Sequence, residues 1–196
     1  VKIMIVNIIK TLPWYFVGLA VLGAPAILLI ISLFVLPDAE SFFFGSDWVA
    51  NIFMDMDGIL DDGQDPYMAT ADFNYMFAWL NINLFIVTFI ISLGWSIGSH
   101  FLNIDEPGKA KFFGLSWIIV TGACIGAIVI VCFIVLQFSS TFPASQDITT
   151  TSQTNMIILT TAYYSLMYWI SVILGTARQA RSSVLLANKL PARNFL

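Results

Sequence analysis

The feature that most constrains the fold is an apolar stretch, residues 112–136, that holds 25 residues and no charged side chain. An α-helix of that length reaches about 37 Å at a rise of about 1.5 Å per residue. The hydrocarbon core of a bilayer is about 30 Å thick, so such a helix would cross it with some tilt. Within lipid, a single segment can satisfy its own backbone N–H and C=O groups only as a helix. The stretch therefore predicts a transmembrane helix.

Three further apolar stretches of similar length lie along the chain, at residues 12–36, 75–99 and 155–176. The composition agrees with a membrane protein, since 59% of the residues are hydrophobic and 10% are charged, whereas soluble domains carry about 25% charged residues. Little of the chain is left for a separate soluble domain. We expect an all-α integral membrane protein with four transmembrane helices, folded as one domain over residues 1–196.

The start of the chain allows two interpretations. Apolar residues at helical spacing, such as Val6 and Ile9, favour a short helix at the membrane surface over residues 1–11. The same residues could equally be the beginning of the first span. Trp14 and Tyr15 follow at the start of the predicted span, where aromatic rings commonly occupy the membrane–water interface.

The longest polar stretch, residues 37–74, holds nine of the twelve acidic residues and no Lys or Arg. Within it, Trp48, Ile52 and Met56 recur at helical spacing, and Ser46 precedes them as a candidate N-cap. We therefore predict an amphipathic helix over residues 47–60, lying on the membrane or over the bundle in the first exterior loop.

The distribution of basic residues predicts how the chain is threaded. All eight Lys and Arg residues lie before the first span, between the second and third, or after the fourth: Lys2, Lys10, Lys109, Lys111, Arg178, Arg181, Lys189 and Arg193. The other two connections carry none. Because basic residues concentrate in cytoplasmic segments, both termini and the turn at residues 103–111 are expected in the cytoplasm. The membrane would be a plasma or bacterial inner membrane.

Small residues four apart mark two of the spans. Gly94 and Gly98 lie in the second span, and Gly122 and Gly126 lie in the third. Such stripes let another helix backbone approach closely, either within one chain or at an interface between chains. Gly is common in membrane helices, so the plainer interpretation is that the third span packs on the second within one bundle.

Two other groups of polar residues invite a functional interpretation. The first is an acidic cluster that partly resembles a calcium loop but lacks the closing Glu: Asp55, Asp57, Asp61, Asp62 and Asp65. A solvated acidic surface is its default explanation, and a weak cation site is the alternative. The second is a possible polar path through the membrane: Asn81, Asn83, Thr160 and Thr161. Interhelical hydrogen bonds would explain these four residues more simply.

Catalytic and redox motifs are missing from the sequence. His100 is the only histidine, so it has none of the partners usual in zinc or bis-histidine haem sites, and it suits the end of a helix. Cys124 and Cys132 are eight residues apart on one predicted helix, too distant to bridge each other, and are expected to be small buried apolar residues. No Asp, Glu, Lys or Arg lies within a span, which argues against a pump or a proton-coupled carrier.

These observations favour a non-enzymatic structural or assembly subunit of a larger membrane complex. A secretion, conjugation or pilus-type envelope machine is one setting in which such a subunit would work. The alternative is a homo-oligomeric channel, and an enzyme acting on lipids is the least favoured. We expect no cofactor, no metal and no nucleic acid, and the partners would be the lipid bilayer together with other membrane subunits or copies of the chain itself.

Overall fold

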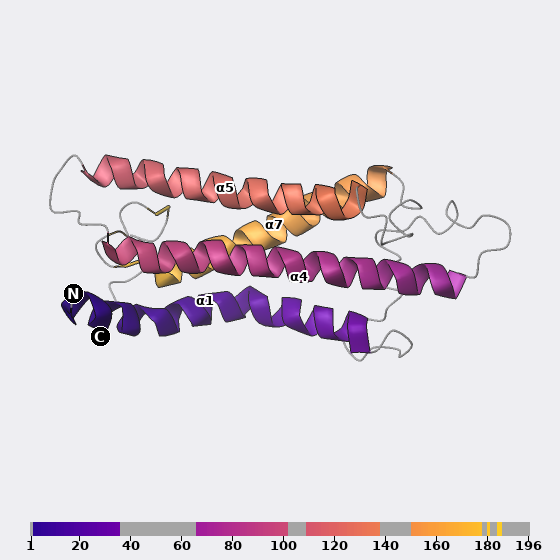
Figure 1. The fold of residues 1–196 in the computed structure, drawn as a ribbon, viewed down its shortest axis with the longest axis horizontal. Coiled ribbons are helices and arrows are strands. Elements are labelled where there is room, and N and C mark those ends of the chain that lie inside the picture. The colour runs from indigo at the N-terminus through magenta and orange to yellow at the C-terminus, as the bar shows by residue number, and fades with distance from the viewer. Residues whose placement is uncertain are drawn as a thin grey trace. The chain divides into compact units, whose positions relative to one another are not determined.

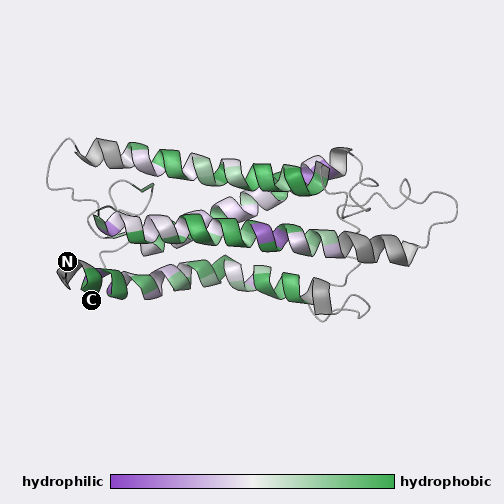
Figure 2. Cartoon of the chain, viewed as in Figure 1, coloured by the Kyte–Doolittle hydropathy of each residue, from purple (hydrophilic) through white to green (hydrophobic). Residues whose placement is uncertain are grey.

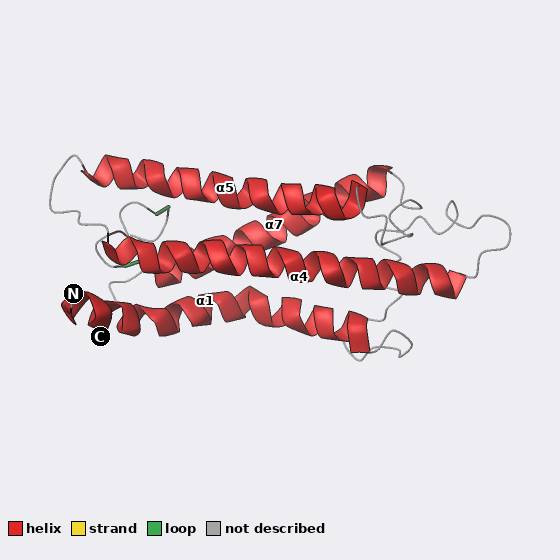
Figure 3. Cartoon of the chain, viewed as in Figure 1, coloured by secondary structure: helices red, strands yellow, loops and turns green. Residues whose placement is uncertain are grey.

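The computed structural model describes residues 2–35, 66–101, 109–137, 150–177, 180 and 184–185. This part of the chain is almost wholly helical and contains no strand (Figure 3). Figure 1 labels its four long helices, which are α1 (Lys2–Val35), α4 (Pro66–Gly98), α5 (Lys109–Gln137) and α7 (Thr150–Gly175). A 3-10 turn, η1 (Ser99–Phe101), continues from the end of α4.

Each of the four helices is long and apolar enough to cross a membrane, as Figure 2 shows by hydropathy. The candidate spans are Ile5–Ile31, Tyr75–Phe101, Gly114–Leu136 and Gln153–Gly175. Their mean hydropathies are 2.3, 2.0, 3.0 and 1.6, so the span in α5 is the most apolar. The four helices confirm the predicted all-helical fold class and indicate a multi-pass membrane protein.

The ends of two helices differ from the simplest interpretation of the sequence. α1 is continuous from Lys2, with no break near Thr11, so residues 2–11 are the beginning of the first long helix. α4 begins at Pro66, nine residues before the predicted start of the second span at Tyr75. Proline suits the first position of a helix because that position needs no backbone N–H donor. The predicted helix over residues 47–60 lies outside the described residues.

The residues group into two compact units. Unit 1 comprises Val1–Ala24, Val87–Gly126 and Tyr164–Leu196, and unit 2 comprises Pro25–Ile86 and Ala127–Tyr163. Both units contain part of every long helix. The assignment of the whole chain to one domain stays a prediction.

The two units bury different kinds of side chain. In unit 2 the buried residues are chiefly apolar, and they include Met76, Leu80, Leu84, Ile128, Leu136 and Met156. In unit 1 many of the fully buried side chains carry a hydroxyl group, and they include Tyr15, Thr88, Ser92, Tyr164, Ser171 and Thr176. Buried hydroxyl groups need hydrogen-bond partners, and those of Tyr15 and Thr176 find them on α4.

Candidate functional site

A row of small hydroxyl side chains runs along α4 and into η1 in unit 1. Thr88, Ser92, Ser96 and Ser99 follow one another at intervals of four, four and three residues, which places them on one face of the helix. All four are buried, with at most 2% of their surface exposed. The row meets α1 on one side and the end of α7 on another.

The contacts with α1 come from Tyr15 and Thr11. The Tyr15 hydroxyl lies 3.0 Å from the Ser92 hydroxyl, and both lie 3.2 Å from the carbonyl oxygen of Phe89. Tyr15 is completely buried, so it is a packing residue between α1 and α4 and not the interfacial ring that its position suggested. Nearer the end of the helices, the Thr11 hydroxyl lies 2.7 Å from Nε2 of His100.

The contacts with α7 satisfy the backbone at the end of that helix. The Ser96 hydroxyl donates to the carbonyl of Gly175 at 2.9 Å, and the Ser99 hydroxyl accepts from the backbone N–H of Ala177 at 3.0 Å. The last carbonyls of a helix have no partner within it, so α4 here caps α7. The Trp95 indole N–H also donates to Thr176 Oγ1 at 3.1 Å. We call the residues whose side chains make these contacts the polar network.

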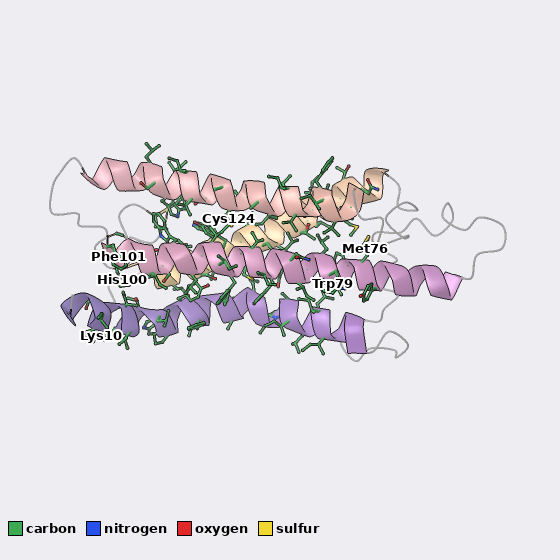
Figure 4. All side chains as sticks on the ribbon, in the orientation of Figure 1. Lys10, Met76, Trp79, His100, Phe101 and Cys124 are labelled. Carbon is green, nitrogen blue, oxygen red and sulfur yellow. The ribbon has the colours of Figure 1, made fainter. Side chains whose placement is uncertain are left out.

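The polar network thus comprises Thr11, Tyr15, Ser92, Trp95, Ser96, Ser99, His100 and Thr176. Figure 4 shows His100 at the same end of the helices as Lys10 and Phe101.

Two glycines allow the helix backbones of unit 1 to approach closely. A Cβ atom at Gly18 would lie 3.0 Å from the carbonyl oxygen of Ile170 and 3.0 Å from Cα of Ser171, so α1 touches the backbone of α7 there. A Cβ atom at Gly175 would lie 2.6 Å from Oγ of Ser96 and 2.9 Å from Cβ of Tyr15. Gly175 therefore sits where α1, α4 and α7 meet, and no larger residue fits without displacement.

The glycine stripes predicted from the sequence lie elsewhere. A Cβ atom at Gly94, Gly98, Gly122 or Gly126 would meet no atom within 4 Å in the part of the chain that the structure describes. The expected close packing of Gly122 and Gly126 on the second span is therefore not found there. A role for these four glycines in contacts between chains stays a prediction.

The residues of the predicted polar path all belong to unit 2, and three of them bond to their own helix. The side-chain amides of Asn81 and Asn83 donate to the carbonyls of Phe77 and Trp79 at 2.7 and 2.8 Å. The Thr160 hydroxyl donates to the Met156 carbonyl at 2.6 Å and lies 3.4 Å from Sγ of Cys132. Thr161 is half-buried beside it on α7. A path formed by these residues stays a prediction.

Cys124 and Cys132 are free and completely buried, as expected for small apolar residues. The acidic cluster at residues 55–65 lies outside the described residues. Within the described part of the chain, no three His, Cys, Asp or Glu side chains are grouped to hold a metal ion.

The chain also turns back after α7. Ala177, Ala180 and Val184 are buried, and the Trp169 indole N–H donates to the carbonyl of Leu185 at 3.3 Å. Trp169 lies six residues before the end of α7, so the segment returns about 9 Å along the helix. Ala177, Ala180 and Val184 are therefore part of the packed structure of unit 1, a feature that the basic character of the tail did not reveal.

The hydrogen bonds of the polar network join neighbouring helices and helix ends. The hydroxyl protons of Ser96, Ser99 and Thr176 are donated to backbone carbonyls, at 2.9, 2.8 and 2.6 Å. The described side chains include no carboxylate, so none orients His100 as the third member of a catalytic triad would. The arrangement fixes the mutual position of α1, α4 and α7 in unit 1. No protein-family model, curated protein or solved structure matches this chain.

The close contacts predict which glycines tolerate a methyl group. Gly18→Ala and Gly175→Ala should each destabilise the protein by about 1–3 kcal/mol, because the new atom overlaps atoms of neighbouring helices. Gly94→Ala is the matched control, since its methyl group meets nothing within 4 Å. The measurement is the midpoint of thermal unfolding in detergent. Equal midpoints for the three variants would contradict the assigned helix contacts.

The polar network predicts a ranking of two conservative substitutions. Ser99→Ala removes the acceptor of the buried Ala177 N–H and should cost about 1–3 kcal/mol. Tyr15→Phe should cost less, about 0.6 kcal/mol, because Ser92 keeps the Phe89 carbonyl as its acceptor and no polar group is left unpaired. Reversible unfolding in mixed micelles measures both values. The capping role of Ser99 is wrong if Tyr15→Phe proves the more damaging of the two.

Proposed function

We propose that the chain is a non-enzymatic structural or assembly subunit of a larger membrane complex. The observation that carries the proposal is the contrast between α5 and the other three helices. In unit 1, α1, α4 and α7 are joined by the polar network and by close backbone contacts at Gly18 and Gly175. The surface of α5 is largely left uncovered by the described chain.

Several properties of α5 support a role in contacting other chains. Only 17% of its most apolar stretch is buried, against 28–44% in the other helices. The hydrogen bond that joins it to α7 in unit 1, between Thr121 and Tyr168, is long at 3.4 Å. Gly122 is exposed and flanked along the helix by Ile118 and Ile119, which are 59% and 61% exposed. A glycine surrounded by large apolar side chains leaves a shallow hollow into which another helix can pack.

The role of α5 is tested by filling this hollow. Gly122→Leu and Gly126→Leu should leave the thermal stability of the isolated chain unchanged, since no described atom lies within 4 Å. They should reduce the size of the assembly extracted in mild detergent, measured by size-exclusion chromatography with light scattering. Ala123→Leu is the matched control, because it adds similar bulk at a position turned about 100° around the helix. Gly94→Leu and Gly98→Leu make the same test on α4.

A complex of unchanged size in all four glycine variants would remove the support for α5 as the interface. A loss of monomer stability would instead mean that the stripes pack within the chain.

Charge supports the proposed orientation in the membrane. Unit 1 contains all eight Lys and Arg residues and only two acids, Asp105 and Glu106, which gives it a formal charge of +6. Unit 2 contains the other ten acids and no basic residue, which gives −10. Since basic residues near the ends of spans are retained in the cytoplasm, both termini and the turn at residues 103–111 would lie on the cytoplasmic side. The acidic connection between α1 and α4 would then face outward.

The orientation predicts which positions can be labelled from outside the cell. Single cysteines introduced at Ser46 and Thr150 should react with an impermeant thiol reagent in intact cells, and one at Ala192 should react only after lysis. The native Cys124 and Cys132 are buried, so they should give little background. Labelling at Ala192 in intact cells would show that the orientation is wrong.

A further inference from the structure

Lys10 corrects the expectation that no charged residue lies within a span. It lies within the candidate span Ile5–Ile31, five residues from its start, which corresponds to about 7 Å along the helix. It is exposed, and it is the only Lys or Arg whose side chain is among those described. The described side chains include no Asp or Glu, so none of them can form an ion pair with it.

The neighbours of Lys10 on the helix surface are apolar and exposed. Val6, Lys10, Trp14, Val17 and Val21 follow at intervals of four, four, three and four residues, which places them on one face of α1. The four apolar members are 37–53% exposed, with Trp14 at the lower limit and Val21 at the upper. We name these five residues the Lys10 face. In a membrane this face would meet lipid, because apolar side chains of this size are exposed beside the lysine.

The depth of the Lys10 ammonium group in the membrane would place it near the phosphate groups of lipids. A lysine about one and a half turns inside a span can extend its apolar stem toward the interface and place its charge at the level of the lipid phosphates. Tryptophan favours the same depth, because its ring is apolar and its N–H is polar. The valines at 17 and 21 continue the face toward the centre of the span, where acyl chains would lie.

The surrounding charge favours an anionic lipid. Unit 1, to which Lys10 belongs, has a formal charge of +6. Lys109 and Lys111 lie in the first turn of α5, and Arg178 follows the end of α7 by three residues. These residues also lie next to the ends of candidate spans, so the basic residues of unit 1 would attract anionic headgroups over zwitterionic ones.

We propose that the Lys10 face binds an anionic phospholipid, with Lys10 contacting the phosphate, Trp14 lying beside the headgroup, and Val17 and Val21 along an acyl chain. The inference rests on the membrane placement proposed above. It goes further by assigning a lipid class and a particular lysine to the site.

The test uses the purified full chain in detergent, titrated with phosphatidylglycerol or phosphatidylcholine and observed by native mass spectrometry. Phosphatidylglycerol should bind more tightly, and Lys10→Gln should weaken its binding about fivefold, the effect expected of one basic residue near a membrane surface. Lys10→Arg should retain binding. Lys189→Gln, which removes the same charge from the C-terminal tail of unit 1, is the matched control and should behave like the wild type.

Three results would overturn the proposal: equal binding of the two lipids, equal losses in Lys10→Gln and Lys189→Gln, or full competition by soluble glycerol phosphate. The second would show a response to net charge alone, and the third would show that the acyl chains are not bound. Flotation of the wild-type chain with phosphatidylcholine vesicles separates this inference from the membrane placement. A chain that does not float refutes the placement, whereas a chain that floats without preferring phosphatidylglycerol refutes only the lipid site.

Discussion

The contacts among α1, α4 and α7 in unit 1 depend on Gly175, the last residue of α7. Its carbonyl accepts a hydrogen bond from Ser96, and its missing side chain leaves room for Tyr15. In lipid, helices gain little from the hydrophobic effect when they associate, because lipid tails are as apolar as the side chains that they replace. Close backbone packing and buried hydrogen bonds must supply the specificity instead. Gly175 combines both, since one small residue lets two neighbouring helices approach and presents an acceptor to one of them.

The sequence predicts the helices well because the chemistry of lipid leaves few alternatives. Each long apolar stretch has to satisfy its own backbone, so the existence and type of all four helices follow from composition alone. The ends are less constrained. α4 begins at Pro66, nine residues before the start predicted for the second span. A proline at the first helical position loses no hydrogen bond. The sequence favours a loop for residues 66–74 because they follow a polar, acidic stretch.

The contact glycines were harder to predict than the helices. α5 is apolar around its whole circumference, so its pattern does not distinguish an inner from an outer face. A glycine pair on such a helix shows where an approach is possible without showing which face is turned inward. The sequence does contain a pattern for the contacts among α1, α4 and α7. Ser171 and Gly175 on α7, and Ser92 and Ser96 on α4, are also pairs of small residues four apart. A search for serine as well as glycine at this spacing would have identified these pairs. Gly18 has no small residue four positions away, so this pattern does not identify it.

α1, α4 and α7 are held together by several hydrogen bonds in unit 1, whereas the one between Thr121 of α5 and Tyr168 of α7 is long at 3.4 Å, so the proposed function depends on what packs against α5. α1, α4 and α7 each lose a specific partner if one of them moves, because Tyr15, Ser96 and Ser99 form hydrogen bonds across their contacts. α5 is the most apolar of the four and has the smallest buried share. A helix of this kind gains stability from any well-packed neighbour, and the described part of the chain places no atom within 4 Å of a Cβ at Gly122 or Gly126. A second chain that packed against these glycines would gain contacts without disturbing the polar network. Such an arrangement would suit a subunit that folds first and assembles afterwards.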